Sequence, residues 1–352
     1  MKIFKQLPGL CLLVLFALAS CKKSNKPDAA PDAGNGVYVS GNTSQGAAVW
    51  KDGVAENLPG LPNNSFTSST AMLAVGSDIY IAGYTGTNAY DTNTTAVYWK
   101  NGTITKLDAG TTDAAQAVGI ATSGSDVYVA GNINYTSTNA AYWKNGVITN
   151  LTSPAVYSYS VAASIAVSGA DVYVCGYIHK NSTAHSEAAY WKNGVLNEIT
   201  DGSKQAWASS IAAQNNDISI VYSEVNTFAS GQFTIGHYWK NGISSQLSND
   251  LLYSYPGFLL VNGSDVYIAG YLGASSTQIV PGFWKNNVFQ KFPDLGPYGS
   301  ADGIAVSGND VYATGYTTGV AGHATGVYWK NGVEVKLADS TANPNGIAVI
   351  GH

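Results

Sequence analysis

Arginine is absent from this 352-residue sequence, and all seventeen of its basic residues are lysines. Without guanidinium groups, the chain cannot recognise a carboxylate or a phosphate through two parallel hydrogen bonds. Five lysines fall within the first 26 residues and seven others each follow a repeated tryptophan, so few cations remain to neutralise a row of phosphates. We therefore expect no nucleic-acid partner. The seven repeated lysines are Lys51, Lys100, Lys144, Lys192, Lys240, Lys285 and Lys330.

Cysteine is nearly as scarce, with three residues in the chain. Cys11 and Cys21 belong to the amino-terminal segment and only Cys175 remains in the body, so we expect no intramolecular disulfide. Cys175 stands in DVYVCGY, where a related segment at position 126 reads DVYVAGN. It replaces a small alanine, which favours a buried packing role over that of a catalytic thiol.

Long apolar runs are also missing, apart from a short one at 10–19 that follows Lys2 and Lys5. LASC at 18–21 resembles a bacterial lipobox, in which cleavage before the cysteine leaves that cysteine lipidated. The run is too short for a comfortable membrane span. We predict a lipoprotein signal peptide at 1–20, lipidation of Cys21 and a flexible tether at 21–35. The alternative is an ordinary cleaved signal in which Cys21 has no role.

This amino-terminal layout predicts a protein of the bacterial cell envelope, lipid-anchored at the outer membrane, whose contact with the membrane runs through the lipid anchor only. The residues after Cys21 are basic, and sorting rules differ between bacteria. A periplasmic and a surface-facing position therefore both stay open.

Two short signatures recur along the rest of the chain, each seven times. One is typified by AAYWKNGVITNL at 140–151, and its tryptophans are separated by 44 to 49 residues. The other lies upstream in each repeat and is typified by DVYVAGN at 126. Each repeat can be read as four short strands, with the Asn-Gly dipeptide favouring a tight type I′ hairpin between the last two. Repeats of this length and composition predict the blades of a β-propeller.

The ends of the repeat region predict how the ring closes. The region begins at GVYVSG, a second strand with no first strand before it, and finishes with NGIAVIGH at 345–352, which matches the first strand DGIAVSGN at 302. The last strand would thus supply the inner strand of blade one and remove an exposed sheet edge. We predict an all-β, seven-bladed β-propeller of four-stranded antiparallel blades as one domain over 36–352, in a monomer.

The repeats resemble those of the extracellular HAF-type repeat family. The resemblance rests on YWKNG with a Leu or Ile closing the hairpin and on VYVAG, and it covers essentially the whole chain after the tether. The Gly-x-Asp turn before the second strand departs from the family pattern. The resemblance implies an exported propeller and says little about activity.

Residues present in nearly every blade are expected to build the blade. The aspartate before each second strand, for example Asp171, is predicted to bond its own turn backbone and not to form a metal ring. The histidines form no regular metal-ligand pattern, and the motifs of serine hydrolases and zinc proteases are absent. We expect no metal and no cofactor.

Aromatic residues are distributed unevenly among the connections between blades. They gather in the connections that enter blades four to seven. On a background of Asn, Ser and Thr, such rings suit stacking on sugars or burying the side chains of a partner. The alternative is that they only cover the tops of the blades. The predicted ligand-binding residues are Tyr157, Tyr159, Trp207, Tyr253, Tyr255 and Tyr298.

Two functions follow from this face of the ring. The first is a binding or scaffold module for a glycan or a protein. The second is a carbohydrate-active hydrolase or lyase that uses acidic residues of the same face, which would need two carboxyl groups about 5 to 10 Å apart. Sialidase chemistry is excluded because the chain has no arginine. The candidate acids are Asp91, Asp113, Glu187, Glu224 and Asp302.

Overall fold

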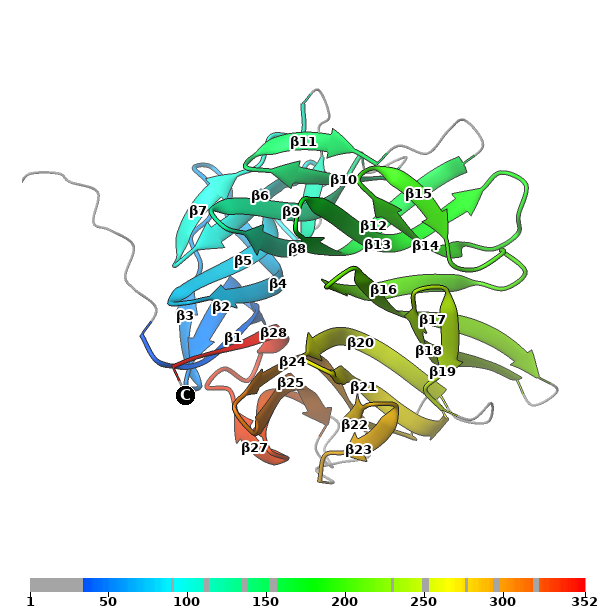
Figure 1. The fold of residues 1–352 in the computed structure, drawn as a ribbon. Helices are drawn as coiled ribbons and strands as arrows, with labels where there is room; N and C mark the ends of the chain where they lie inside the picture. Colours follow the sequence, from blue (N-terminus) through cyan, green and yellow to red (C-terminus); the bar gives the residue numbers. More distant parts are fainter. Residues whose placement is uncertain are drawn as a thin grey trace, which may run out of the picture.

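The computed structural model describes residues 34–89, 92–110, 114–134, 138–151, 157–228, 231–248, 253–275, 278–293, 298–318 and 323–351. These residues form 28 strands in seven four-stranded antiparallel sheets. The sheets stand around a central axis as the blades of a propeller (Figure 1). Within the described ranges, no helix has the length and apolarity needed to cross a membrane.

The inner strands, one per blade from blade one to blade seven, surround the axis. They are β28 (Asn343–Ile350), β4 (Phe66–Val75), β8 (Ala115–Ser123), β12 (Tyr157–Ser168), β16 (Ala206–Gln214), β20 (Tyr253–Asn262) and β24 (Tyr298–Ser307). The second strands follow in the same order of blades. They are β1 (Gly36–Thr43), β5 (Asp78–Gly86), β9 (Asp126–Ile133), β13 (Asp171–Lys180), β17 (Asp217–Phe228), β21 (Asp265–Ser275) and β25 (Asp310–Thr318).

The third strands carry the repeated tryptophan. They are β2 (Gly46–Lys51), β6 (Thr95–Lys100), β10 (Asn139–Lys144), β14 (Glu187–Lys192), β18 (Gly231–Lys240), β22 (Gln278–Lys285) and β26 (Ala324–Lys330). The outer strands are four residues each. They are β3 (Val54–Asn57), β7 (Thr103–Lys106), β11 (Val147–Asn150), β15 (Val195–Glu198), β19 (Ile243–Gln246), β23 (Val288–Lys291) and β27 (Val333–Lys336).

The first blade joins the two ends of the repeat region. Its strand order is β28-β1-β2-β3, and β28 runs antiparallel to β1 with Tyr38 opposite Ala348 and Val39 opposite Ile347. Figure 1 shows this carboxy-terminal strand beside the first blue strand. The predicted seven-bladed fold and its closure are therefore confirmed.

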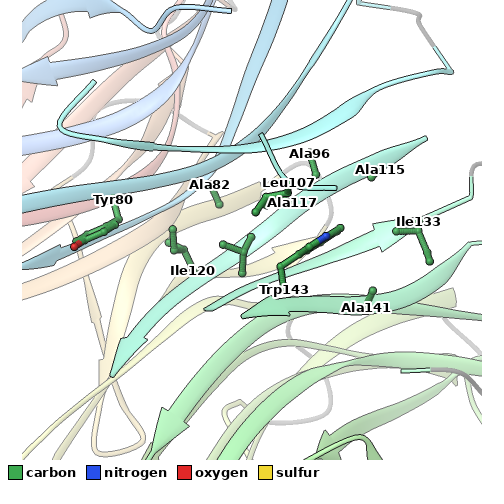
Figure 2. Packing of buried hydrophobic residues seen from close by; sticks show 11 residues of the cluster. Tyr80, Ala82, Ala96, Leu107, Ala115, Ala117, Ile120, Ile133, Ala141 and Trp143 are labelled. Atoms are coloured by element: carbon green, nitrogen blue, oxygen red, sulfur yellow. The ribbon is translucent and has the colours of Figure 1, made fainter. Parts of the chain in front are cut away.

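The tryptophan of the third strand fills the space between one blade and the blade before it. Trp143 of blade three is completely buried beside Leu107, which follows the outer strand of blade two (Figure 2). The indole N–H of Trp99 donates to the Pro59 carbonyl, 2.8 Å away in the connection that leaves blade one. Trp143 and Trp284 make the same kind of bond, whereas the buried indole N–H groups of Trp50, Trp191 and Trp329 have no hydrogen-bond partner in the described residues. Burial of the large ring is therefore the contribution that these blade junctions share.

The glycine of the VYVAG signature is required by the same packing. A Cβ at Gly83 would overlap the carbonyl oxygen of Ser68 and lie 2.8 Å from the ring of Trp99. Only glycine leaves room for this close approach between strand and ring. The two signatures of a repeat are therefore parts of one contact.

The aspartate before each second strand is bound by the neighbouring hairpin turn, whereas we expected it to bond the backbone of its own turn. In blade four, Asn193 donates to Asp171 at 2.7 Å and accepts from the backbone N–H of Val172. Lys192 pairs with the same carboxylate at 2.8 Å and lies 5.3 Å from the centroid of the Tyr173 ring. The role of Asp171 is structural as predicted, but its main partners lie in the neighbouring hairpin and not in its own turn. Asn193 and Gly194 both have positive φ, at 51° and 84°, as a type I′ turn requires.

Cys175 and two histidines, His179 and His237, take packing positions. Cys175 is fully buried, and burial raises the pKa of its thiol far above the usual range. His237 is buried and stacks on Tyr222 with ring centroids 4.6 Å apart, while His179 stacks on Tyr159. No cluster of three or more potential metal ligands occurs in the part of the chain that the structure describes.

Candidate functional site

Each inner strand has a β-bulge at the same position, and the bulged residues form a ring around the axis. A bulge leaves one residue without a partner on the neighbouring strand and re-aims its side chain. All seven bulged residues line the same central channel. From blade one to blade seven they are Asn345, Thr70, Val118, Ala163, Ser209, Gly257 and Asp302.

The central channel has a volume of about 470 Å³. Much of its wall is apolar and includes Met72, Ile120, Ile211 and Phe258. Asp302 is the only charged residue among the described residues that line it. A single carboxyl therefore dominates the electrostatics of an otherwise neutral channel.

Three of the bulged residues bond the next blade. Thr70 donates to the carbonyl of Ala117 at 2.9 Å, and Ser209 donates to that of Pro256 at 2.7 Å. Asn345 of blade one donates in the same way to the carbonyl of Ser69 in blade two at 2.6 Å. In each case the acceptor directly precedes the bulge of the following blade. The bulge position is thus a donor site that joins adjacent blades.

Asp302 occupies this donor site with a group that cannot donate when it is ionised. Its carboxylate instead accepts a hydrogen bond from the Ser300 hydroxyl, at 2.7 Å within the same strand. Burial raises the pKa of Asp302 to about 6, and the bond from Ser300 offsets part of that shift. No lysine of the described residues forms an ion pair with this carboxyl.

The bulge also explains the irregular spacing of the predicted aromatic residues. Trp207 and Tyr255 stand two residues before the bulge of their strands, Tyr159, Tyr253 and Tyr298 stand four before it, and Tyr157 stands six before it. Successive side chains of a strand point to opposite faces, so the offsets of two and four place five of these rings on equivalent faces. Tyr157 is the exception, because a second bulge at Ser158 puts it opposite Lys180 while Tyr159 lies opposite His179. The different offsets in sequence become successive levels above Asp302.

Trp207 of blade five and Tyr255 of blade six, each two residues before the bulge of its strand, connect these two blades. The ring of Tyr255 stacks on that of Tyr271 with centroids 5.5 Å apart and planes at 11°. Burial raises the pKa of the Tyr255 phenol, a hydrogen bond with the side chain of Trp207 partly offsets this, and the charge of Asp302 raises it again. Trp207, Tyr255 and Asp302 therefore lie close together.

Blade seven adds two further rings to this group. Tyr298 and Tyr316 have centroids 6.1 Å apart. Burial, the neighbouring Tyr255 and Tyr298, and the Asp302 charge together raise the pKa of Tyr271 to about 12. Burial, Tyr298 and the Asp302 charge also raise the pKa of Tyr316. We call Trp207, Tyr255, Tyr271, Tyr298 and Tyr316 the aromatic cluster.

The other three predicted aromatic residues have partners outside the aromatic cluster. Tyr159 packs edge-on against Tyr177 and its hydroxyl lies 3.0 Å from that of Ser186. The hydroxyl of Tyr157 donates to Glu198 at 3.3 Å, on the outer strand of the same blade. The hydroxyl of Tyr253 donates to the Gln232 carbonyl at 2.6 Å. All six predicted rings are partly exposed, so they are not sealed between blades.

Sequence reasoning missed Tyr271 and Tyr316. Both end the second-strand signature, as in DVYIAGY and DVYATGY, and a repeated residue was taken to be architectural. A signal was present, because this position alternates between Tyr, Asn and Ser along the chain. Asn132, at this position in blade three, bonds the backbone of Ala162 in the next blade at 2.8 and 3.0 Å. Where this position is Tyr, the side chain is a ring and lacks the amide that makes these bonds in Asn132.

The three candidate acids that the structure describes, Glu187, Glu224 and Asp302, do not come together. Glu187 is completely buried and paired with Lys180 at 2.7 Å, and Glu224 is paired with Lys204. Asp302 alone reaches the channel, and no second carboxyl lines the described channel wall. Asp91 and Asp113 lie outside the described residues.

No protein-family model matches this chain, and no curated protein matches it by sequence. Solved structures of propellers are similar to it in fold. One is a puromycin-hydrolysing peptidase of Mycobacterium tuberculosis, with a TM-score of 0.55 and 11% identity over 89% of this chain; the match spans 55% of the length of the peptidase. Another is the β-propeller domain of the Trilobed protease from Pyrococcus furiosus, with a TM-score of 0.50 and 11% identity over 86% of this chain and 94% of that domain. At this identity the likeness shows the propeller fold alone.

Proposed function

We propose that this protein is an envelope-anchored β-propeller that binds a ligand, a glycan or a protein, at the loop-rich face above its central channel. Cys21 would carry the lipid, and the propeller would serve as a binding or scaffold module resembling HAF-type repeat proteins. The observation that carries the proposal is the aromatic cluster, whose partly exposed rings lie near a carboxyl that has no cation partner among the described residues. Exposed rings at one place on a propeller face favour recognition over packing.

The irregular positions of the rings along their strands support a binding role. Residues that build the blades repeat at fixed positions, as Trp99, Trp143 and Trp191 do, and these are completely buried. The predicted binding residues occupy several levels in blades four to seven and remain partly exposed. A purely structural cover would not need to differ from blade to blade.

A carbohydrate-active hydrolase or lyase is the second candidate, and one observation favours it. The pKa of Asp302, raised to about 6 by burial, suits a general acid that works near neutral pH. A glycosidase needs a second carboxyl nearby, and the described channel wall supplies none. The peptidase neighbours lend nothing to either candidate, because their likeness is one of fold.

The decisive experiment measures retention and turnover together. The soluble domain is passed over immobilised envelope polysaccharides and over a glycan array, and the eluted glycans are analysed for chain cleavage. Retention without cleavage, lost in Trp207→Ala but kept in Trp207→Phe, is expected for a binding module. Release of shorter products, abolished in Asp302→Asn, would instead establish the hydrolase or lyase.

A further inference from the structure

We propose that the ligand presents an alkylammonium group, which binds at Asp302 among the rings of Tyr255, Tyr271 and Tyr316. This inference rests on the proposed binding function and narrows its ligand to one that carries an organic cation. It is carried by three features of the site: an unpaired carboxyl, the position that this carboxyl takes in the repeat, and the rings beside it.

The carboxyl of Asp302 has one hydrogen bond, from Ser300, and no cationic partner among the described residues. The lysines closest to the loop-rich face are already engaged, with Lys180 bound to Glu187 and Glu198 and Lys204 bound to Glu224. A largely buried carboxylate without a counter-ion is costly. A ligand cation would supply the missing charge.

The repeat shows that a carboxyl is not needed there for folding. Thr70, Ser209 and Asn345 fill the equivalent position in other blades and bond the next blade as neutral donors. When it is ionised, Asp302 has no proton to donate and cannot make this bond to the next blade. Since the same chain uses better structural solutions at the same position, an acid at this one points to a role toward a ligand.

The rings near Asp302 favour the same kind of group. The face of a phenol or indole ring attracts cations, most strongly where water is partly excluded. Tyr316 lies opposite Ser300, whose hydroxyl bonds the Asp302 carboxyl, and Tyr255 lies opposite Tyr271 and stacks on it. The Asp302 charge raises the pKa values of all three phenols, in agreement with this arrangement. A carboxylate near several rings would stabilise an ammonium by charge and by cation–π contact together, whereas a neutral sugar would use only the rings.

A metal ion fits this site poorly. Calcium takes six or more oxygen ligands and usually several carboxylates. The described channel wall offers one carboxyl, and its other oxygen-bearing bulge side chains, Thr70, Ser209 and Asn345, already bond the next blade. An organic cation needs one carboxylate and apolar contact, and both are present.

The test uses the soluble domain and calorimetric or NMR titration with four probes. Two probes are cations: N-acetyl-lysine methylamide represents a protein lysine, and butyltrimethylammonium represents a small quaternary amine. Two are neutral controls: N-acetyl-norleucine methylamide is the uncharged analogue of the lysine probe, and a methyl glycoside represents a neutral sugar. We expect at least one cationic probe to bind and the norleucine analogue to bind about ten-fold or more weakly. The cation that binds more tightly identifies the source.

Asp302→Asn is expected to remove this preference, with binding of the cationic probe reduced about ten-fold or more. Glu56→Gln, on the exposed outer strand β3, removes the same net charge and should bind as the parent protein does. In the unaltered protein, binding should weaken as the pH falls below about 6, because protonation neutralises Asp302. The phenols of Tyr255, Tyr271 and Tyr316, whose pKa values are raised, stay neutral throughout this range. Histidine contributions are recognised because they would persist in Asp302→Asn.

Several results would overturn the inference. They are failure of both cations to bind, equal binding of the lysine and norleucine probes, and unchanged binding in a correctly folded Asp302→Asn variant. If glycans or a partner protein are still retained and that retention depends on Trp207, the proposed binding function stands while the ammonium inference fails. If nothing is retained, both fail. Should Asp302→Asn not fold, the pH profile of the unaltered protein decides.

Discussion

Asp302 of blade seven and Asn345 of blade one hold the same bulge position in adjacent blades, yet they bond differently. The amide of Asn345 donates to the carbonyl of Ser69 in blade two at 2.6 Å. Asp302 accepts from Ser300 within its own strand. One position in the repeat thus contributes a bond between blades in one case and a charge facing the channel in the other.

Replacing Asp302 with Asn is expected to stabilise the fold at neutral pH. The pKa of the carboxyl is raised from 3.8 to about 6, so the folded state binds its proton more tightly than the unfolded state does. Ionisation therefore lowers stability as the pH rises from about 4 to about 6, and the loss stays constant at higher pH. Asp302→Asn should gain on the order of 3 kcal/mol at pH 8 and little at pH 4, since each unit of pKa shift corresponds to about 1.4 kcal/mol.

Denaturant unfolding of both proteins between pH 4 and pH 8 measures this difference, with Glu56→Gln as the control for net charge. A variant that is less stable at every pH would show that the Asp302 carboxyl is a structural element. A gain in stability together with a loss of cation binding would mark a residue kept for its ligand.

Replacing Trp207 with Ala is expected to weaken ligand binding about ten-fold or more with little effect on the fold, because the ring is partly exposed beside Tyr255. Trp207→Phe keeps an aromatic face and should retain most of the affinity. Glycan-array and pull-down signals measure the effect, and circular dichroism checks the fold. Signals that survive Trp207→Ala combined with Tyr255→Ala would refute the predicted site.

Removing residues 344–352 is expected to destabilise the entire ring. Blade one would lose its inner strand, and β1 would expose an unpaired edge that invites aggregation. The milder variant Ile347→Ala, which truncates a buried side chain of that strand, should cost about 2 to 4 kcal/mol and remain soluble. Thermal melting and size-exclusion chromatography check both, and an unchanged melting temperature in the truncated protein would contradict closure by β28.

Replacing Cys21 with Ala is expected to release the protein from membranes, because the proposed anchor is a lipid chain on this cysteine. Fractionation of cells that express each form, followed by high-salt and carbonate washes, measures this. The unaltered protein should remain in the membrane fraction and enter the detergent phase. A Cys21→Ala form that still resists the washes would show that the anchor lies elsewhere.

Replacing Asn193 separates two contributions to the repeated hairpin. Asn193→Gly loses the bonds to Asp171 and Val172 but can still adopt the positive φ of 51° without strain. Asn193→Ala loses the same bonds and is also strained at this φ. We expect both variants to be less stable, with Ala about 1 kcal/mol worse than Gly. Equal stability of the two, measured by denaturant unfolding, would mean that backbone conformation contributes nothing at this turn.

The sequence by itself determined the ring. Short-range patterns repeated seven times specify each blade, because strand alternation and the Asn-Gly turns act over a few residues, and the mismatch between the first and last strands specifies closure. The glycine of VYVAG and the tryptophan of YWKNG were recognisable as architecture, although their mutual contact was not.

Only the tertiary structure decided which residues meet above the channel. The bulges re-aim one residue per inner strand, and a bulge depends on how two strands pair, which leaves no mark in the pattern of one strand. Asp302 was one acid among five in the sequence, and of the three that the structure describes it alone faces the channel. Tyr271 and Tyr316 join it from the second strands, because neighbouring blades bring together residues far apart in the chain.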